Sequence, residues 1–260
     1  LDYGIGLPTL HNAGLIRKEI VAGTTTFGVL LDNSGTVQAK AGAILFPTGS
    51  NLGGIFQADS GATISFSSGT YTLSSPPSNF QGPGTVQFTT VNLTLNAFTG
   101  TYTLNSSTLL VGQNTVAATG TINLNGSNLG PGASLTIASN AVLNIQNSVV
   151  FQGAMTNFGT VNWLGGSVAI NTNGGTTGVI WNQAGAVFDI QCSQLLRYGL
   201  ELPTFHNAGL LRKSATSGTT AITVKLDNTG TVQAQTGVIS VQGPYIESST
   251  ANLAIILSAL

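Results

Sequence analysis

Few side chains in this sequence could carry out acid–base chemistry. Enzymes that cleave polysaccharides need two carboxylates side by side, or Arg or Lys beside a calcium-binding acidic cluster. Asp59 and Asp189 are separated by 129 residues that include no Asp, Glu, Lys, Arg or His, and Asp32 has no acidic neighbour at a matching position. We therefore expect no catalytic residue and predict that the protein is not an enzyme. The carboxylates are Asp2, Glu19, Asp32, Asp59, Asp189, Glu201, Asp227 and Glu247.

Several of the charged residues recur at equivalent positions of a long repeat. A ligand site at these positions would recur once per period. The alternative is that His caps a corner, while Arg and Lys solvate an outward edge and contact Asp32 across the adjacent turn. The sequence leaves both interpretations open and assigns no ligand-binding residue. The equivalent pairs are His11 and His206, Arg17 and Arg212, Lys18 and Lys213, and Asp32 and Asp227.

No metal, cofactor or phosphate site is indicated. Cys192 is the only cysteine, which excludes an internal disulfide and a Cys/His metal cluster, and we expect it to be a small buried side chain. The glycine pairs at 53–54, 165–166 and 174–175 lack the Lys and the helix of a phosphate-binding loop and are typical of turns. No G-x-S-x-G elbow stands between a strand and a helix.

The composition indicates a folded but almost uncharged protein. Charged residues make up 6% of the chain, against roughly 25% in an average soluble domain, while apolar residues make up 42%. The net charge of −1 offers no basic surface to nucleic acid or anionic membranes. No apolar run reaches the length of about 18 residues that a spanning helix needs, so no membrane span is predicted.

A long internal repeat organises the chain. Residues 3–45 match residues 198–240 at a constant offset of 195 without gaps, and 26 of these 43 positions are identical. The first copy reads YGIGLPTLHNAGLIRK and LDNSGTVQAKAG, and the second reads YGLELPTFHNAGLLRK and LDNTGTVQAQTG. The chain thus covers one long period and the start of another, and we expect a single domain over residues 1–260.

A shorter period predicts the fold. Apolar residues two apart share one face of a strand, and a preceding glycine permits a sharp corner. Corner positions from Gly14 to Gly209 recur at steps of 16 to 26 residues, which predicts nine turns of roughly 22 residues. We predict an all-β, right-handed parallel β-helix (β-solenoid) with coils of roughly 16–26 residues; an antiparallel sandwich is the main alternative. Gly-Thr-apolar-polar-apolar segments begin at Gly35, Gly69, Gly84, Gly100, Gly120, Gly159 and Gly230.

The alternation within these strands separates core from surface. The Asn-rich strings at 92–96, 123–128 and 143–147 predict amide ladders, because stacked Asn side chains in neighbouring coils satisfy one another. Stacked aliphatic and aromatic rows inside the coil are expected to provide most of the stability. The side chains predicted to be buried are Val37, Leu73, Phe88, Leu104, Leu124 and Trp163.

The motifs HNAGLIRK, LDNSGTVQAKAG and SGATISFSSGTYTL resemble the repeat region of large secreted bacterial surface proteins. The similarity is to filamentous-haemagglutinin-like proteins and autotransporter-adhesin passengers, and it covers most of the chain. It implies a β-helix outside the cell or on the bacterial surface, where such regions serve as stalks, adhesive surfaces or matrix components. This sequence departs from the better-known adhesins in its shortage of charge, and the resemblance leaves the export route and the ligand open.

These observations favour an extracellular structural or adhesive β-solenoid module, a segment of a larger surface protein or fibre. The alternative is a carbohydrate-binding module for a neutral polysaccharide, which would stack on outward aromatic rings. Ice binding is a third hypothesis, and its T-x-T rows would come from residues 24–26, 70–72 and 101–103. The aromatic candidates are Tyr71, Tyr102, Trp163 and Trp181, of which the strand alternation places the first three in the core.

The two ends of a solenoid predict self-association. A strand edge that nothing covers invites pairing with another chain, and natural solenoids cap their ends with atypical repeats. The run NLAIILSAL at 252–260 is apolar and carries no charge. We expect head-to-tail self-association or tandem copies in a longer chain. Nine coils at about 4.8 Å each predict an axial repeat of roughly 43 Å.

Overall fold

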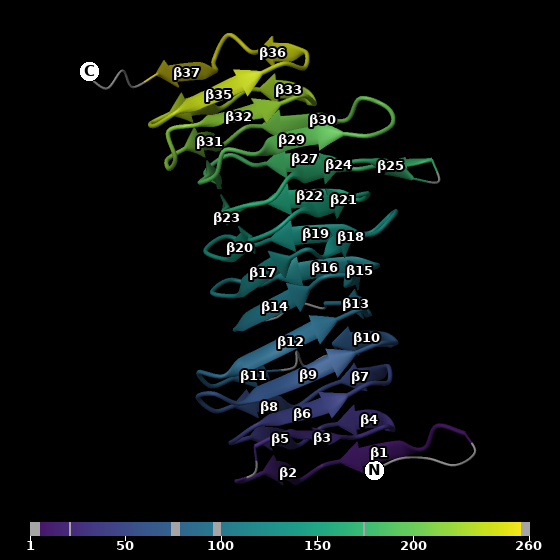
Figure 1. The fold of residues 1–260 in the computed structure, drawn as a ribbon. Coiled ribbons are helices and arrows are strands. Elements are labelled where there is room, and N and C mark those ends of the chain that lie inside the picture. Colours follow the sequence, from purple (N-terminus) through teal and green to yellow (C-terminus); the bar gives the residue numbers. More distant parts are fainter. Residues whose placement is uncertain (1–5, 21, 74–78, 96–99, 174, 256–260) are drawn as a thin grey trace.

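The computed structural model describes residues 6–20, 22–73, 79–95, 100–173 and 175–255. In these residues the backbone forms strands β1 to β37 and no helix, and the strands stack as successive coils along one axis (Figure 1). No described segment is therefore a helix that could cross a lipid bilayer. The expected parallel β-solenoid is confirmed. The antiparallel sandwich is excluded, because the only antiparallel pair among the described strands is the small hairpin of β25 (Thr172–Asn173) and β26 (Thr176–Thr177).

The described strands follow one another around three faces in a fixed order. The first face is a twelve-stranded sheet. Its strands are β1 (Thr9–Asn12), β4 (Leu30–Asn33), β7 (Ser50–Leu52), β10 (Thr70–Leu73), β13 (Asn92–Thr94), β15 (Leu109–Leu110), β18 (Asn128–Leu129), β21 (Val149–Phe151), β24 (Val168–Ile170), β29 (Leu195–Tyr198), β32 (Thr219–Ile222) and β35 (Val238–Val241).

The second face comprises a four-stranded and a seven-stranded sheet, which hold the same place in the coil order. The first of these sheets contains β2 (Leu15–Lys18), β5 (Thr36–Ala39), β8 (Ile55–Ala58) and β11 (Asn79–Gln81). The second contains β16 (Gln113–Val116), β19 (Ser134–Ile137), β22 (Ala154–Asn157), β27 (Val179–Asn182), β30 (Thr204–Asn207), β33 (Lys225–Asn228) and β36 (Tyr245–Glu247).

The third face is again a twelve-stranded sheet. Its strands are β3 (Thr24–Thr26), β6 (Ala43–Phe46), β9 (Thr63–Ser67), β12 (Thr85–Thr89), β14 (Thr101–Asn105), β17 (Thr121–Asn125), β20 (Val142–Ile145), β23 (Thr160–Trp163), β28 (Val187–Ile190), β31 (Leu210–Lys213), β34 (Thr231–Ala234) and β37 (Asn252–Ile255).

Coil length varies while the strand register holds. Residues that pair across neighbouring coils are 16 positions apart at the shortest, between Gln87 and Thr103, and 28 apart at the longest, between Val168 and Leu196. The longest coil includes the β25–β26 hairpin, so the additional residues leave the wall of the solenoid as an insertion. The corners and insertions therefore differ in length, while the strands stay in register. A shift of one residue would turn the apolar side chains of a strand outward.

The interior is filled by side chains from alternate positions of all three faces. The aromatic rings of Phe46, Phe66 and Phe88 lie above one another on the third face, with centroids 5.6 Å and 4.8 Å apart. The Tyr71 hydroxyl donates a hydrogen bond to the Phe46 carbonyl at 2.7 Å, so this buried phenol is satisfied. The residues predicted to be buried are all at most 1% exposed, which confirms the predicted register: Val37, Leu73, Phe88, Leu104, Leu124 and Trp163.

Glycine is needed at a corner because the next coil approaches it closely. A Cβ atom on Gly35 would lie 2.2 Å from the Gly14 carbonyl oxygen, and one on Gly54 would lie 2.2 Å from the Gly35 carbonyl oxygen. These three glycines belong to corners of the second face, whereas Gly61 and Gly84 belong to corners of the third face. The corner positions read from the sequence thus change face between Gly35 and Gly61.

This change of face corrects the predicted nine turns. Thr9 opens β1 on the first face, but its equivalent Thr204 opens β30 on the second face. The long period is therefore nine coils and one face, and its axial length at about 4.8 Å per coil is about 45 Å. The two copies of the repeat are turned by one face relative to each other. Residues 3–5 and 21 of the first copy lie outside the described residues.

The stacked interior predicts a steep difference between inward and outward leucines. Leu124 is 1% exposed and Leu164 is 41% exposed. Leu124→Ala should lower the free energy of unfolding by about 2–5 kcal/mol, because it removes packed atoms and leaves a cavity. Leu164→Ala is the matched control and should cost under about 1 kcal/mol. Urea unfolding followed by circular dichroism measures both changes, and equal costs would contradict the assigned faces.

Candidate functional site

Three side chains from successive coils form an outward row on the second face. Trp181, His206 and Asp227 occupy equivalent positions on β27, β30 and β33. The Trp181 and His206 rings are parallel, with centroids 3.8 Å apart and an interplanar angle of 6°. Nδ1 of His206 lies 3.0 Å from Oδ2 of Asp227. Because the partners belong to successive coils, the rings stack along the solenoid axis.

A shallow hollow accompanies this row. It has a volume of about 230 Å³ and includes Gln183 and Thr229 beside the three stacked side chains. Trp181 is 39% exposed, but one face of its indole is covered by the His206 ring. The row therefore offers solvent an aromatic edge, a carboxylate and an amide, which are groups that hydrogen-bond to or stack on a neutral ligand.

The first repeat copy holds the same His–Asp pair in a more exposed setting. Nδ1 of His11 lies 2.8 Å from Oδ2 of Asp32, and the His11 side chain is 75% exposed. His11 and His206 thus lie on strands and contact the aspartate of the next coil, so the expectation that histidine caps a corner is wrong. The structural reason is the parallel register, which pairs His11 directly with Asp32 and His206 directly with Asp227.

The arginines of the two copies have different partners. Arg212 donates two hydrogen bonds to Asp189 on the coil before it, at 3.2 Å and 2.8 Å. Burial raises the pKa of Asp189, but hydrogen bonds from Arg212 and other neighbours outweigh burial, so this pKa lies below its usual range. Arg17 instead contacts Glu19 on the same coil. The predicted contact from Arg17 to Asp32 is therefore wrong.

Lys213 contradicts the expectation that these cations solvate an outward edge. Its side chain is fully buried at the end of β31, and its Nζ donates to the Cys192 carbonyl at 2.7 Å and to Oγ1 of Thr216 at 2.9 Å. Nζ also lies 3.3 Å from Oγ1 of Thr220, and burial lowers the pKa of the amine below its usual range. Lys18, its equivalent in the first copy, is only half-buried and bonds to Thr25 at 3.1 Å. The lysine predicted to contact Asp32 therefore bonds elsewhere.

Cys192 is buried as predicted. Burial raises the pKa of its thiol to about 11. A thiol with a raised pKa is a poor nucleophile at neutral pH, because the thiolate is the reactive form. Its backbone carbonyl, which accepts from both Lys213 and Thr220, is the part of this residue that contributes a polar contact.

The predicted amide ladders run along the outside of the third face. Nδ2 of Asn144 donates to Oδ1 of Asn123 at 2.8 Å, and Nδ2 of Asn162 donates to Oδ1 of Asn144 at 2.9 Å. Asn125 likewise donates to Asn105 at 3.1 Å. Three pairs of stacked asparagines thus confirm the ladder hypothesis for this face. Asn96, from the first of the Asn-rich strings, lies outside the described residues.

A second ladder, buried at the corners, was missed by the sequence prediction. Asn157, Asn182, Asn207 and Asn228 form a continuous chain of side-chain hydrogen bonds of 2.8, 2.8 and 2.7 Å. The signal that could have found it is Asn two residues before a corner glycine, as in NFG at 157–159, NAG at 207–209 and NTG at 228–230. These inward-pointing side-chain amides thus provide hydrogen-bond partners for one another at the buried corners.

The structure separates the other candidate ligand residues. Tyr71, Tyr102 and Trp163 are fully buried as core side chains, which leaves Trp181 as the outward aromatic among the four. The T-x-T segments at 24–26 and 101–103 lie on the third face with other strands between them, whereas 70–72 lies on the first face. They do not form one continuous threonine array.

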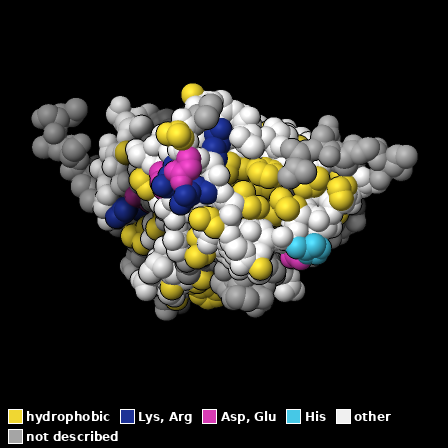
Figure 2. All heavy atoms as spheres, turned by 90° about the horizontal axis from the view of Figure 1, so that it is seen from below, with side chains coloured by type: hydrophobic (Ala, Val, Ile, Leu, Met, Phe, Trp, Pro, Cys, Tyr) yellow, Lys and Arg dark blue, Asp and Glu magenta, His cyan; other side chains and the backbone are white. Residues whose placement is uncertain are grey.

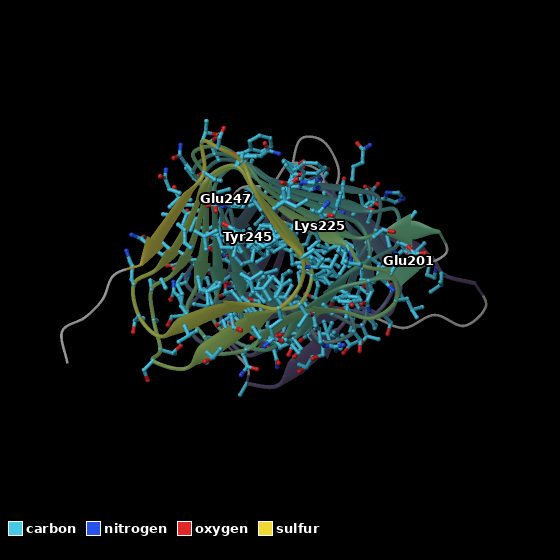
Figure 3. All side chains as sticks on the ribbon, turned by 90° about the horizontal axis from the view of Figure 1, so that it is seen from above. Glu201, Lys225, Tyr245 and Glu247 are labelled. Atoms are coloured by element: carbon cyan, nitrogen blue, oxygen red, sulfur yellow. The ribbon has the colours of Figure 1, made fainter. Side chains whose placement is uncertain are left out.

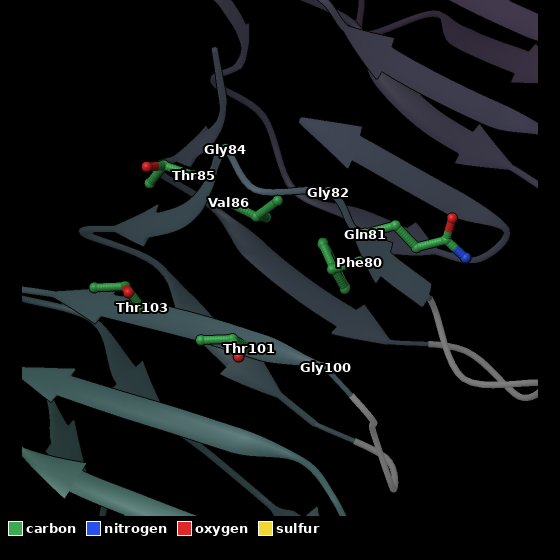
Figure 4. Close-up of a pocket in the computed structure, with 9 residues that line it drawn as sticks. All are labelled: Phe80, Gln81, Gly82, Gly84, Thr85, Val86, Gly100, Thr101 and Thr103. Carbon is green, nitrogen blue, oxygen red and sulfur yellow. The ribbon is translucent and has the colours of Figure 1, made fainter. Parts of the chain in front are cut away.

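A further hollow of about 310 Å³ opens between β11, β12 and β14 (Figure 4). Its polar side chains are Gln81, Thr85, Thr101 and Thr103, and no titratable side chain lines it. Within the described part of the chain, no three His, Cys, Asp or Glu residues gather as a metal site would require.

Comparison with known proteins adds no further constraint. No protein-family model, curated protein or solved structure matches the chain. The structure is therefore a three-faced parallel β-solenoid, and ten of the fifteen charged residues in the sequence lie within the two copies of its long repeat.

The buried amine of Lys213 predicts a specific dependence of stability on pH. Lys213→Met should leave the protein at least as stable at pH 7, because replacing a buried charge by an apolar side chain is often neutral or stabilising. Thr220 still bonds to the Cys192 carbonyl, and Ser193 still bonds to Thr216. The pKa of the folded lysine is lowered, so the native protein gains stability as pH rises from that pKa towards the unfolded value of about 10.4.

The variant lacks this gain, so its advantage over the native protein should shrink between neutral pH and about pH 10. Unfolding by guanidinium at several pH values measures the difference between the two proteins. A variant that is less stable at pH 7 by more than about 2 kcal/mol would show that the charged lysine network stabilises the fold.

Proposed function

We propose that this chain is an extracellular structural or adhesive module, one segment of a longer rod or fibre. The observation that carries the proposal is the open C-terminal end of the described solenoid. No described strand pairs with the outer edges of β35, β36 and β37. A hollow of about 460 Å³ lies there, lined mainly by apolar side chains that include Val238, Ile239, Val241 and Leu253. Figure 3 looks onto this end, where Tyr245 and Glu247 are labelled.

The N-terminal end is similarly apolar. Figure 2 looks onto it and shows hydrophobic side chains gathered from its middle towards the right, with a cluster of basic and acidic side chains to their left and a histidine beside an acidic side chain below them. The inward side chains Leu10, Ile16 and Phe27 pack against the core there but are only partly buried. Apolar ends with free strand edges are surfaces on which a further coil continues the sheets, as successive repeats do in other solenoids.

The sides of the solenoid suit an exposed, uncharged stalk or adhesive surface. From β9 to β23 the outward positions of the third face carry Thr, Ser, Asn, Gln and Val and no charge. Hydroxyl and amide groups wet such a surface. The resemblance to secreted bacterial surface proteins agrees with this role and supports a location outside the cell. A non-enzymatic role accords with the scattered carboxylates: Asp32, Asp189 and Asp227 each meet a basic partner. Asp59 and Glu201 meet amide or hydroxyl groups.

Head-to-tail association should therefore depend on the two ends and not on the sides. The variant Val238→Lys places a charge on the open C-terminal edge, where Val238 is 50% exposed. We expect electron microscopy of the native protein at high concentration to show thin rods, and the variant to remain in single units. Leu164→Lys, on the side of the solenoid, is the matched control and should still form rods. Native protein that stays in single units, or rods that persist in Val238→Lys, would refute association through this end.

Carbohydrate recognition is a second candidate, favoured by the exposed edge of Trp181 beside Asp227 and Gln183. If this row binds neutral glycans, Trp181→Ala should reduce retention on a neutral polysaccharide by at least about tenfold, the loss of one aromatic contact. Tyr198 of β29 is 38% exposed on the first face, and Tyr198→Ala should leave retention unchanged. Affinity electrophoresis against several neutral polysaccharides measures both, and unchanged mobility of native protein in all gels would exclude this candidate.

A further inference from the structure

The same strand–corner–strand sequence occurs twice in this chain, once at the N-terminal edge and once inside the solenoid. In the inner copy, β27 lies beneath β30 and β28 lies beneath β31. In the first copy, no described strand lies beneath β1 or β2. The inner copy therefore shows which contacts this sequence makes when its lower side is covered.

Three side chains of the inner copy contact the coil below. The ring of His206 stacks on Trp181, and Oδ1 of Asn207 accepts a hydrogen bond of 2.8 Å from Asn182. The guanidinium of Arg212 pairs with Asp189, a carboxylate that is only 4% exposed. One aromatic ring, one amide and one carboxylate thus satisfy the lower side of the repeat.

The first copy has the same three residue types at the equivalent positions, His11, Asn12 and Arg17. Their contacts with the coil above are complete: His11 meets Asp32 at 2.8 Å and Asn12 donates to Asn33 at 2.6 Å. These contacts match those of His206 with Asp227 and of Asn207 with Asn228.

The first copy lacks the contacts with a coil below that the inner copy makes. The His11 side chain is 75% exposed, whereas that of His206 is 28% exposed. Arg17 turns to Glu19 of its own coil, and the inner copy has Ser214 at the position of Glu19. The N-terminal coil thus has the upper contacts of an interior coil and the lower surface of an uncovered one.

We infer that the lower surface of β1 and β2 is a docking surface for one more coil of the type formed by residues 179–190. That coil places a tryptophan against His11, an asparagine against Asn12 and an aspartate against Arg17. The inference rests on the proposed function as a rod segment. The coil that occupies this surface belongs to a preceding copy of the long repeat in the same polypeptide. A complete second molecule cannot supply it, because β27 and β28 are already covered on both edges there.

The C-terminal coil of a second molecule fits this surface less well. Its last strands are VISV in β35, YIE in β36 and NLAI in β37. None carries a tryptophan or an aspartate. β36 has Tyr245 and Glu247, but the register aligns Ile246, and neither of these two, with the outward position of Asp227, so no strand reproduces both the ring stack and the paired carboxylate of the inner copy. Residue chemistry therefore favours a coil of the 179–190 type over the chain's own end.

Successive copies of the long repeat are rotated by one face relative to each other, and this rotation determines where the strands of a preceding copy lie. A preceding copy is rotated back by one face, which brings its VIWN strand to the first face, beneath β1, and its VFDI strand to the second face, beneath β2. Tandem copies then present their His–Asp pairs on successive faces, about 45 Å apart along the axis. A complete return to the same face takes three copies, about 134 Å.

A designed extension tests the inference. Residues 146–197 are fused directly in front of residue 3, which reproduces the natural junction between residues 197 and 198. Hydrogen exchange then compares the amides of β1 and β2 in the extended and unextended proteins. We expect protection of these amides to rise by at least about tenfold, towards that of β30 and β31, because opening of the end coil becomes less frequent.

The matched control carries Trp181→Ala, Asn182→Ala and Asp189→Ala in the added segment alone. Its gain in protection should be smaller by at least about fivefold if these three side chains recognise the end coil. An equal gain would show that any added strand suffices, and no gain in either protein would show that the surface takes no such coil. Either result would overturn the inference, while rod formation by the unextended protein separately decides the proposed function.

A substitution in the first coil gives an independent measurement. Glu19→Ser introduces the residue that the inner copy has at position 214 and frees Arg17 from its local partner. The change also removes the contact of Glu19 with Lys40 in both proteins. It should therefore lower the protection of β2 more in the unextended protein than in the extended one, where the aspartate below pairs with Arg17. Equal loss in both proteins would contradict the predicted pair.

Discussion

The structure depends on one constraint: the backbone of each strand is satisfied by the coils before and after it, and not by its own coil. Every major sheet is parallel, and each strand of these sheets pairs with strands at least 16 residues away in the chain. A single coil therefore cannot bury its core or complete its hydrogen bonds alone. Stability must come from neighbours, which makes the two end coils the places where the fold is incomplete.

The same register explains why charge is so scarce. In a parallel sheet in register, equivalent positions of successive coils lie about 4.8 Å apart, so a repeated charge would face its own copy and repel it. Asparagine and phenylalanine gain from being stacked, as in the Asn123–Asn144–Asn162 ladder and the Phe46–Phe66–Phe88 row. Charges occur where the register brings opposite partners together, as between Asp189 and Arg212.

The long repeat shows that identical residues differ in burial and in hydrogen-bond partners when the neighbouring coils differ. Lys18 and Lys213 follow the same motif, yet one lies half-buried at the N-terminal end and the other is fully buried. Lys213 meets the Cys192 carbonyl of the coil below, a group for which the first copy has no described equivalent. The histidines differ in the same way, because a stacked indole covers His206 and none covers His11.

The sequence by itself determined the parallel solenoid, its inward face and the outer amide ladders. These follow from local patterns: alternation sets which side chain points inward, as at Leu124, and glycine marks the corners. The tertiary structure alone decided which corner belongs to which face, since the step from Gly35 to Gly61 has the length of a long coil but contains an additional face. It also decided the partners of Arg212, Lys213 and His206, because those partners lie on another coil and the coil lengths that set the register vary from 16 to 28 residues.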